Sequence, residues 1–343
     1  MYVDHRGYRS IIRYVCAIVV SVAFAYGINW PLAYVTPVFV AKFFADQKVP
    51  SRQTLYELVS AMLVTTGIAL LVSMGLGEYP LLLLVFVGLV MFWAYYLFQD
   101  PDQDFFAMML IMAILLVPYM AISQPSLALY FGQGLMASGV LAVVVFFSVH
   151  YLVPYQPLVD GTEPTPVELA DDNVRVSHAL RALMISFPVI AITYCLQMRG
   201  ALLTMAFISM LSLDLSGPKS IKLGSFLLLA NVSGGLIAVM LYELLAWVPH
   251  FPFMLALMAL VSAVFGVRVF SAGATSPLYA SAFSAVLVLL GAALTLSGRA
   301  IDSSFYSRIG QISAACFYLI IVACFLEFRQ AATRTGKVTL RKN

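Results

Sequence analysis

Successive apolar blocks, each near the length of a membrane-spanning helix, are the feature that most constrains the fold of this chain. Crossing the hydrocarbon core of a bilayer takes about 20 apolar residues in a helix, and only helices and closed barrels satisfy their backbone hydrogen bonds in lipid. We therefore expect an all-α polytopic membrane protein with about twelve transmembrane helices. The blocks cover residues 11–28, 30–45, 55–77, 79–98, 104–122, 126–153, 179–197, 199–213, 220–246, 249–272, 277–297 and 303–328.

The composition agrees with a chain that lies in the lipid bilayer. Hydrophobic residues make up 62% of the sequence and charged residues 10%, whereas a soluble domain carries about 25% charged residues. The formal net charge of +3 is small, so it gives no reason to expect a nucleic-acid partner.

The sequence also contains an internal repeat at a constant spacing of 168 residues. Residues 13–80 and 181–248 share 12 identities in 68 aligned positions. The scarce residue types that recur are Arg13, Tyr26, Thr36, Asp46 and Pro50, with Arg181, Tyr194, Thr204, Asp214 and Pro218 as their counterparts. A duplicated membrane domain is typical of transporters, whose substrate path lies where the halves meet.

The distribution of charge along the chain predicts how the halves lie in the membrane. With a cytoplasmic N-terminus, 16 of the 19 Lys and Arg residues fall on the cytoplasmic side, leaving Arg199, Arg299 and Arg308 outside, as the positive-inside rule requires. Six spans per half make the repeats parallel. We predict six-helix repeats over 1–153 and 178–330, a cytoplasmic linker over 154–177 and a basic cytoplasmic tail over 331–343. The first block is expected to be a retained span, since its counterpart at 179–197 is internal and cannot be a cleaved signal.

The second block of each half, residues 30–45 and 199–213, is shorter than a full span. At about 1.5 Å per residue it reaches about 24 Å, against a core of about 30 Å. Pro31 and Pro37 further interrupt the first of these blocks. Short or broken segments at matching places in two halves indicate a transporter binding site, and this makes Trp30 and Pro37 candidates. Two short tilted helices in a thin region are the alternative.

Polar residues of these short blocks are candidates for the transport path. Thr36 and Thr204 could offer hydroxyl groups to a polar substrate, or could bond back to their own helix carbonyls. Asp46 and Asp214 follow at the ends of the blocks. Either carboxylate could bind and release a proton if burial raised its pKa, or could be the N-cap of the next helix.

Three arginines are candidates for binding an anionic group. Arg13 and Arg181 lie just inside the first span of each half, where a guanidinium could grip a carboxylate. We favour the simpler interpretation, that both snorkel to the membrane surface. Arg308 is expected inside the last span, so it needs a partner or a water-filled cavity, for which Glu57, Glu243 and Asp302 are candidates. A separate set of small residues, Gly67, Gly132 and Gly235, is expected to mediate close helix packing.

Motifs for an enzyme, a cofactor or a metal are weak or missing in the sequence. Cys16, Cys195, Cys316 and Cys324 lie in apolar stretches without the spacing of a disulfide frame or a metal site, so we read them as buried small hydrophobic residues. Asp100, Asp102 and Asp104 could hold Mg²⁺, but the matching loop of the other half has no acidic cluster. No phosphate-binding P-loop is present. We therefore predict a protein that is not an enzyme and has no cofactor or metal.

One motif carries a resemblance to a known family. It reads GINWPLAYVTPVFVAKF at 27–43, follows an arginine and an apolar span, and is part of a six-span repeat. With this pattern the chain resembles the fusaric acid resistance superfamily of aromatic acid exporters. Within it, the chain resembles a short branch known as a domain of unknown function. The resemblance implies a bacterial inner-membrane exporter driven by protons, working with a periplasmic membrane-fusion adaptor and an outer-membrane channel. The chain departs from larger members in lacking a sizeable cytoplasmic domain, and its second half has Met198-Arg199 in place of Trp30-Pro31.

Together these features predict an efflux transporter for small organic compounds, such as aromatic acids or drug-like molecules. A passive anion channel and a structural component of an efflux assembly are the alternatives. A homo-oligomer is compatible with the sequence but not specified by it.

Overall fold

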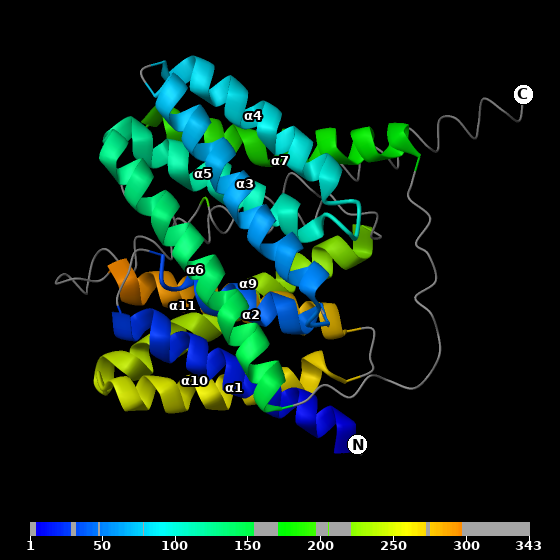
Figure 1. The fold of residues 1–343 in the computed structure, drawn as a ribbon, viewed down its shortest axis with the longest axis vertical. Coiled ribbons are helices and arrows are strands. Elements are labelled where there is room, and N and C mark those ends of the chain that lie inside the picture. The colour runs from blue at the N-terminus through cyan, green and yellow to red at the C-terminus, as the bar shows by residue number, and fades with distance from the viewer. Residues whose placement is uncertain are drawn as a thin grey trace, which may run out of the picture.

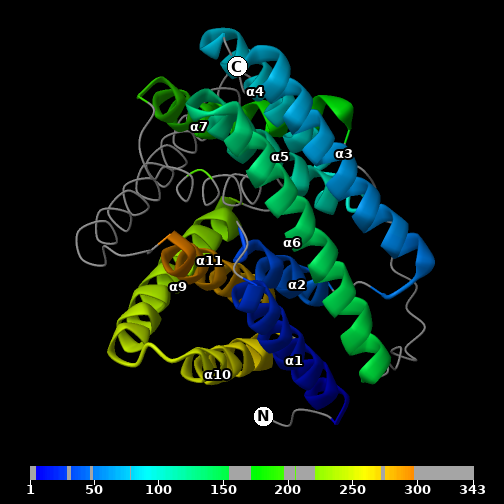
Figure 2. The same cartoon turned by 60° about the vertical axis from the view of Figure 1, so that its left-hand side comes forward.

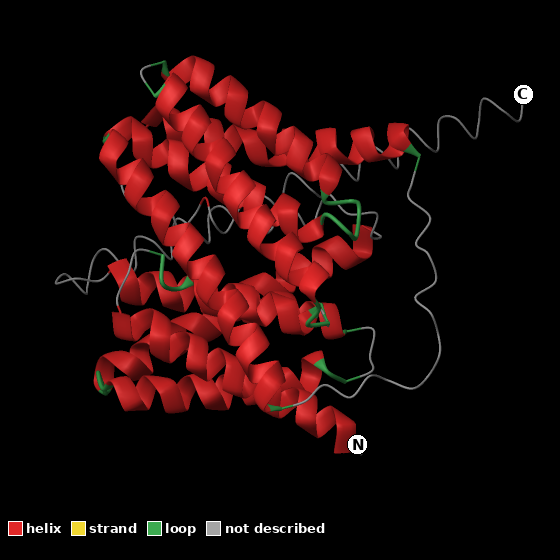
Figure 3. Ribbon diagram, viewed as in Figure 1, coloured by secondary structure: helices red, strands yellow, loops and turns green. Residues whose placement is uncertain are grey.

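The structure, a computed structural model, describes residues 5–28, 32–46, 49–77, 79–153, 171–196, 205, 221–271 and 275–296. Over these ranges the chain forms ten helices and no strand (Figure 3). The first half contributes α1 His5–Ile28, α2 Val35–Ala45, α3 Arg52–Leu76, α4 Pro80–Leu97, α5 Asp104–Ser123 and α6 Pro125–Leu152. The second half contributes α7 Asp172–Leu196, α9 Ile221–Trp247, α10 Phe251–Val269 and α11 Ser276–Leu296.

Turn chemistry in the sequence explains where several helices begin. Pro80, Pro125 and Pro252 each occupy the first turn of a helix, where the missing N–H has no intrahelical partner to lose. Ser51 is the N-cap of α3, and its side chain accepts a hydrogen bond from the Thr54 N–H at 3.0 Å. The helices that begin at these prolines follow the preceding helix after short connections.

Seven of the described helices are long and apolar enough to cross a bilayer: α1, α3, α4, α5, α6, α7 and α10. The outward faces of α3 and α4 carry large apolar side chains, including Leu71, Leu81 and Leu89. Apolar side chains on an outer surface of this kind are expected where lipid surrounds the protein. The lengths and the surface are those of a helical, multi-pass membrane protein.

The helices form two groups that α6 joins (Figures 1 and 2). One group contains α3, α4, α5 and α7, and the other contains α1, α2, α9, α10 and α11. The first helix of each half lies in the other half's group, since α1 packs on α10 and α7 packs on α4. The boundary between the groups therefore differs from the boundary between the halves of the sequence.

Each group is centred on one helix that is enclosed by its neighbours. In the apolar stretch of α5, 83% of the residues are buried within the protein, against 39–50% in the apolar stretches of the other six candidate spans. α11 is enclosed in the same way, with Phe283, Val286 and Leu290 all buried. α5 packs most extensively on α3, and α11 packs most extensively on α9.

Candidate functional site at the short helix α2

α2 is the shortest described helix and lies buried against α1, α6 and α11. Its 11 residues rise about 16 Å, roughly half of a bilayer core. All of Val35–Ala41 is buried, and residues 32–34 of the predicted block form a turn ahead of the helix. The chain reaches α2 through a turn at Leu32–Tyr34, and Leu32 has a left-handed backbone with a φ of 62°. A residue other than glycine is uncommon there, so the turn requires support from its neighbours.

Ser138 of α6 provides this support through two hydrogen bonds. Its hydroxyl donates to the Leu32 carbonyl oxygen at 2.9 Å, and its own carbonyl oxygen accepts from the Thr36 hydroxyl at 3.2 Å. Non-helical backbone at membrane depth persists only where protein or water satisfies it. Thr36 therefore bonds to α6, neither to its own helix nor to open space.

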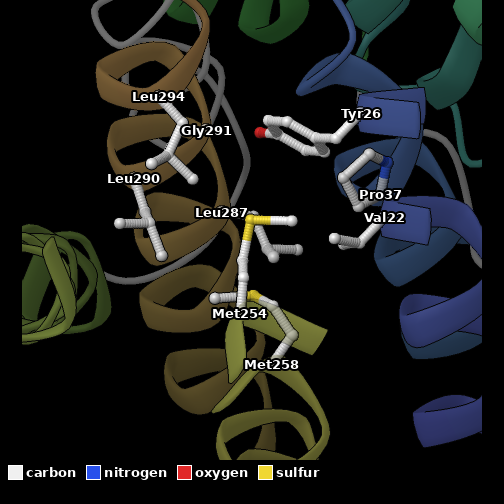
Figure 4. Close-up of a pocket in the computed structure, with 9 residues that line it drawn as sticks. All are labelled: Val22, Tyr26, Pro37, Met254, Met258, Leu287, Leu290, Gly291 and Leu294. Atoms are coloured by element: carbon white, nitrogen blue, oxygen red, sulfur yellow. The ribbon is translucent and has the colours of Figure 1, made fainter. Parts of the chain in front are cut away.

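An apolar pocket opens beside α2 and lies between the halves of the sequence (Figure 4). It contains about 260 Å³ of space not filled by atoms, part of it continuous with the outside. Pro37, a residue predicted from the broken block, forms one wall. The complete lining among the described residues is Val22, Tyr26, Pro37, Met254, Met258, Leu287, Leu290, Gly291 and Leu294.

Gly291 of α11 lets the helix approach the turn before α2. A Cβ at this position would lie 2.3 Å from the Tyr34 Cβ and 2.6 Å from the Tyr26 hydroxyl oxygen. Figure 4 shows the Tyr26 ring extending across the pocket, with its hydroxyl toward α11. The hydroxyl is the only polar side-chain group in the described lining of the pocket.

Aromatic rings close the region between α2, α5 and α6. Phe43 contacts Phe105 with ring centroids 5.1 Å apart and Phe146 at 5.7 Å. Phe44 contacts Phe146 at 5.3 Å and stacks on His150 at 4.9 Å. This layer separates the turn before α2 from the charged residues at the other end of the helix.

Asp46 lies at the C-terminal end of α2 and forms an ion pair with Lys42 at 2.9 Å. Lys42 also approaches Asp104 of α5 at 3.6 Å, so the three charges join the ends of two helices. The Asp46 side chain is 28% exposed, and its role in binding a proton stays a prediction. The N-cap alternative is wrong for Asp46, since Ser51 is the N-cap of α3.

Arg13 is buried in α1, with 6% of its surface exposed, and therefore does not snorkel as we expected. It donates a hydrogen bond to the Ser10 hydroxyl at 3.0 Å and lies within electrostatic range of His150 of α6. Its repeat counterpart Arg181 is only partly buried. The two arginines thus occupy different surroundings despite their matching positions in the sequence.

The three predicted packing glycines differ in their surroundings. A Cβ on Gly132 would meet Leu70 of α3 at 3.3 Å, and one on Gly235 would meet Leu289 of α11 at 3.2 Å. Around Gly67, no heavy atom outside its own helix turn lies within 4 Å of the Cβ position in the described structure. Gly67 therefore makes no close helix contact there, contrary to our expectation.

The sequence did not indicate the polar contact between α4 and α7. Arg175, which we placed in the linker, belongs to α7 and is 9% exposed. Its guanidinium lies 4.3 Å from the centre of the Tyr96 ring and donates to the Tyr96 carbonyl oxygen at 3.3 Å. Tyr96 in turn donates to Asp172 at 2.9 Å. The spacing of Asp172 and Arg175, three residues apart, is the helical signal that could have extended α7 into the predicted linker.

The remaining polar candidates do not form a metal site within the described ranges. Asp100 accepts a hydrogen bond from the Asp102 N–H at 3.1 Å, which is a local turn contact, and Asp104 faces Lys42. Across the described residues no three His, Cys, Asp or Glu side chains come together. Cys16 and Cys195 are exposed on their helices, so the expectation that they are buried is wrong.

Four predicted site residues lie outside the described residues: Trp30, Thr204, Asp214 and Arg308. Their roles stay predictions from the sequence. The same holds for the eighth and twelfth predicted spans, apart from Met205, and for the tail at 331–343.

Comparison with known proteins identifies one matching family. A family model described as a protein of unknown function (DUF2955) matches residues 10–149. The match covers α2, the turn before it and Ser138, and it ends before the second half. No curated protein and no solved structure matches the chain.

Proposed function

We propose that this chain is a membrane transporter for small organic compounds, with a substrate path between its halves beside α2. The observation that supports this most is a buried helix of 11 residues, approached through a non-helical turn and bordered by an apolar pocket. Transporters bind substrates near the bilayer midplane where broken helices of two repeats meet. A helix too short to span the membrane gives no structural advantage to a protein that only needs to be anchored.

We further propose twelve spans in two parallel repeats, which the packing of the described helices supports. The contacts of α1 with α10 and of α3 with α5 correspond to those of α7 with α4 and of α9 with α11. In both halves a glycine of the fourth helix receives an aromatic ring from the first helix of the other half. A Cβ on Gly88 would lie 2.8 Å from Phe187, and one on Gly266 would lie 3.2 Å from Tyr14.

The direction of transport, the substrate class and the coupling come from the resemblance to the fusaric acid resistance superfamily. On this basis the protein exports aromatic acids or drug-like compounds across a bacterial inner membrane, with both termini in the cytoplasm. It exchanges them for protons and works with a periplasmic adaptor and an outer-membrane channel. We propose a transport role without enzymatic activity, cofactor or metal.

A flux measurement tests the transport proposal directly. The full-length protein in vesicles should release a preloaded aromatic anion that stays ionised and does not cross lipid by itself, such as benzenesulfonate, when a pH gradient is imposed, and vesicles without the protein should not. Currents across a planar bilayer without a pH gradient would instead identify a passive anion channel. If neither flux nor current is detected with correctly folded protein, the transport proposal is wrong and a structural role in an efflux assembly remains.

The proton-coupling proposal is tested by replacing the two repeated aspartates. Asp46→Asn combined with Asp214→Asn should abolish the dependence of efflux on the pH gradient if these carboxylates carry the proton. Asp102→Asn, in an exposed turn, is the matched control and should behave as the wild type. Unchanged pH dependence in the double variant would rule out this role.

A further inference from the structure

We propose that a continuous layer of aromatic rings around the C-terminal end of α2 is the cytoplasmic gate of the substrate path, and that the structure has this gate closed. The proposal rests on the proposed function, because a gate has a role only in a protein that passes a substrate. It is argued from the positions of the rings in six helices and from the contacts that hold α2 at its two ends.

The rings contact one another in an unbroken series that crosses from one helix group to the other. Successive ring centroids lie 5.1–6.3 Å apart, within the range in which aromatic pairs attract one another. Every ring belongs to a side chain that is at most 8% exposed. In the order of their contacts, the seven members of this aromatic layer are Phe105, Phe43, Phe146, Phe44, Tyr14, Phe283 and Phe265.

Each helix contributes its ring from the end that the proposed topology places on the cytoplasmic side. α1, α5 and α11 begin on that side, and their rings lie in the first half of each helix. α2, α6 and α10 end on that side, and their rings lie in the second half of each helix. The beginning of α1 accordingly lies beside the end of α6 (Figures 1 and 2). The seven rings therefore form one layer across the cytoplasmic half of the protein.

Four of these helices border the pocket beside α2 at their opposite ends. Tyr26 lies near the end of α1, Met254 near the beginning of α10 and Leu294 near the end of α11, while Pro37 lies near the beginning of α2. Part of the space there is continuous with the outside. A transporter with alternating access closes one side of its path while the other side opens. We therefore assign the structure to the state that is closed toward the cytoplasm.

α2 is the element that would open the gate, because the contacts at its two ends differ in kind. At the beginning, two hydrogen bonds with Ser138 hold the turn at Leu32. At the end, α2 is held by its two rings in the layer and by the ion pair of Lys42 with Asp104 at 3.6 Å, a partly exposed pair of a kind that contributes little to stability. A swing about the turn would keep the hydrogen bonds that non-helical backbone needs in a membrane and separate α2 from α5.

A reversible cross-link across the gate tests whether the end of α2 must move. The full-length protein, with its four native cysteines replaced by alanine, carries Lys42→Cys and Asp104→Cys. A short bifunctional methanethiosulfonate should then abolish the efflux of benzenesulfonate, and dithiothreitol should restore it. Full efflux by the cross-linked protein would overturn the proposal.

The matched control for the cross-link is the pair Tyr96→Cys and Asp172→Cys. These residues join α4 to α7 through a hydrogen bond of 2.9 Å, and both helices belong to one group. Cross-linking them should leave efflux unchanged. An equal loss of efflux in the two cross-linked proteins would contradict a gate that opens at α2.

Access from the cytoplasmic side tests the layer without any transported compound. Met258→Cys, on the pocket side of the layer, reports the reaction with a membrane-impermeant sulfonated maleimide added to inside-out vesicles. Phe43→Ala should speed this reaction about 10-fold, because the opening equilibrium loses the ring contacts with Phe105 and Phe146. Phe106→Ala removes a ring that contacts Trp93 outside the layer, and should not change the rate. Equal rates in the two variants would refute the layer as the barrier.

The two measurements keep the gate and the transport function apart. Efflux that cross-linking of Lys42→Cys to Asp104→Cys does not affect would refute the gate and leave the transport function standing. A protein that passes no substrate, although Phe43→Ala admits the maleimide, would refute the transport function and with it the gate, leaving the aromatic layer as a static barrier.

Discussion

Replacing Gly291 by alanine tests how closely α11 approaches the turn before α2. The added Cβ would lie 2.3 Å from the Tyr34 Cβ, 3.3 Å from its Cα and 2.6 Å from the Tyr26 hydroxyl oxygen. Ordinary contacts between carbon atoms are about 3.5–4.0 Å. The Tyr34 Cβ and Cα move only with the backbone, so side-chain rotation cannot relieve the overlap. Either α11 or the turn must shift by more than 1 Å, as a rough estimate from these distances.

The expected change in stability combines two opposing contributions. Alanine is favoured over glycine inside a helix by about 1 kcal/mol. Overpacking in a close-packed interior typically costs about 1–3 kcal/mol, and a contact against backbone belongs at the upper end of that range. Gly291→Ala should therefore destabilise the protein by about 2 kcal/mol net.

Gly67→Ala is the matched control, because its Cβ would meet nothing within 4 Å in the described structure. It keeps the gain in helix propensity without the overlap, and should stabilise the protein by up to about 1 kcal/mol. The two variants should then differ by about 3 kcal/mol in free energy of unfolding.

Unfolding in mixed micelles with increasing SDS, followed by circular dichroism, measures this difference. If Gly291→Ala and Gly67→Ala had equal stabilities, the close approach of α11 to Tyr34 would be refuted.

Two further substitutions test the hydrogen bonds that hold broken backbone in place. Ser138→Ala leaves the Leu32 carbonyl without its donor and should lower the free energy of unfolding by about 1–3 kcal/mol. The control is Ser60→Ala, at an exposed serine bonded to its own helix, which should change the unfolding free energy by less than about 0.5 kcal/mol. Equal effects of the two substitutions would argue against the Ser138 contact. The Tyr194 hydroxyl of α7 donates to the Leu115 carbonyl oxygen of α5 at 3.1 Å, beside Pro118. Tyr194→Phe removes this bond and should destabilise the protein by about 1–2 kcal/mol, and by clearly less in a Pro118→Ala background, where the helix regains an N–H. A double-mutant cycle from the same unfolding curves measures this coupling, and strictly additive effects would contradict the inserted hydroxyl.

Helix positions could be predicted from the sequence wherever apolar runs end at turn-forming residues. The expected block 104–122 became α5 Asp104–Ser123, and 249–272 became α10 Phe251–Val269. Lipid makes this prediction strong, because a spanning segment must satisfy its own backbone. The same sequence pattern correctly marked the second block as too short for a span.

The details of the site depend on contacts that are distant in the sequence and were therefore not predictable. The turn at Leu32 requires Ser138, which is 106 residues away, and no local propensity indicates a positive φ at a leucine. The burial of Arg13 depends on α6, and the position of Arg175 depends on Tyr96 in the other half. Polar composition suggested a linker at 154–177, whereas packing on α4 extends α7 back to Asp172.

The repeat indicated that Tyr26 and Tyr194 matter, but could not say that they differ. Both reach from the first helix of one half to the central helix of their group, which belongs to the other half, so duplication explains why each half has one. What separates them is Pro118: the proline breaks the hydrogen-bond ladder of α5 and provides Tyr194 with both a donor and an acceptor. The intact ladder of α11 provides Tyr26 with neither, and its hydroxyl is left at the pocket. Residues that the repeat relates can therefore make different contacts, and the helix that each one meets decides which.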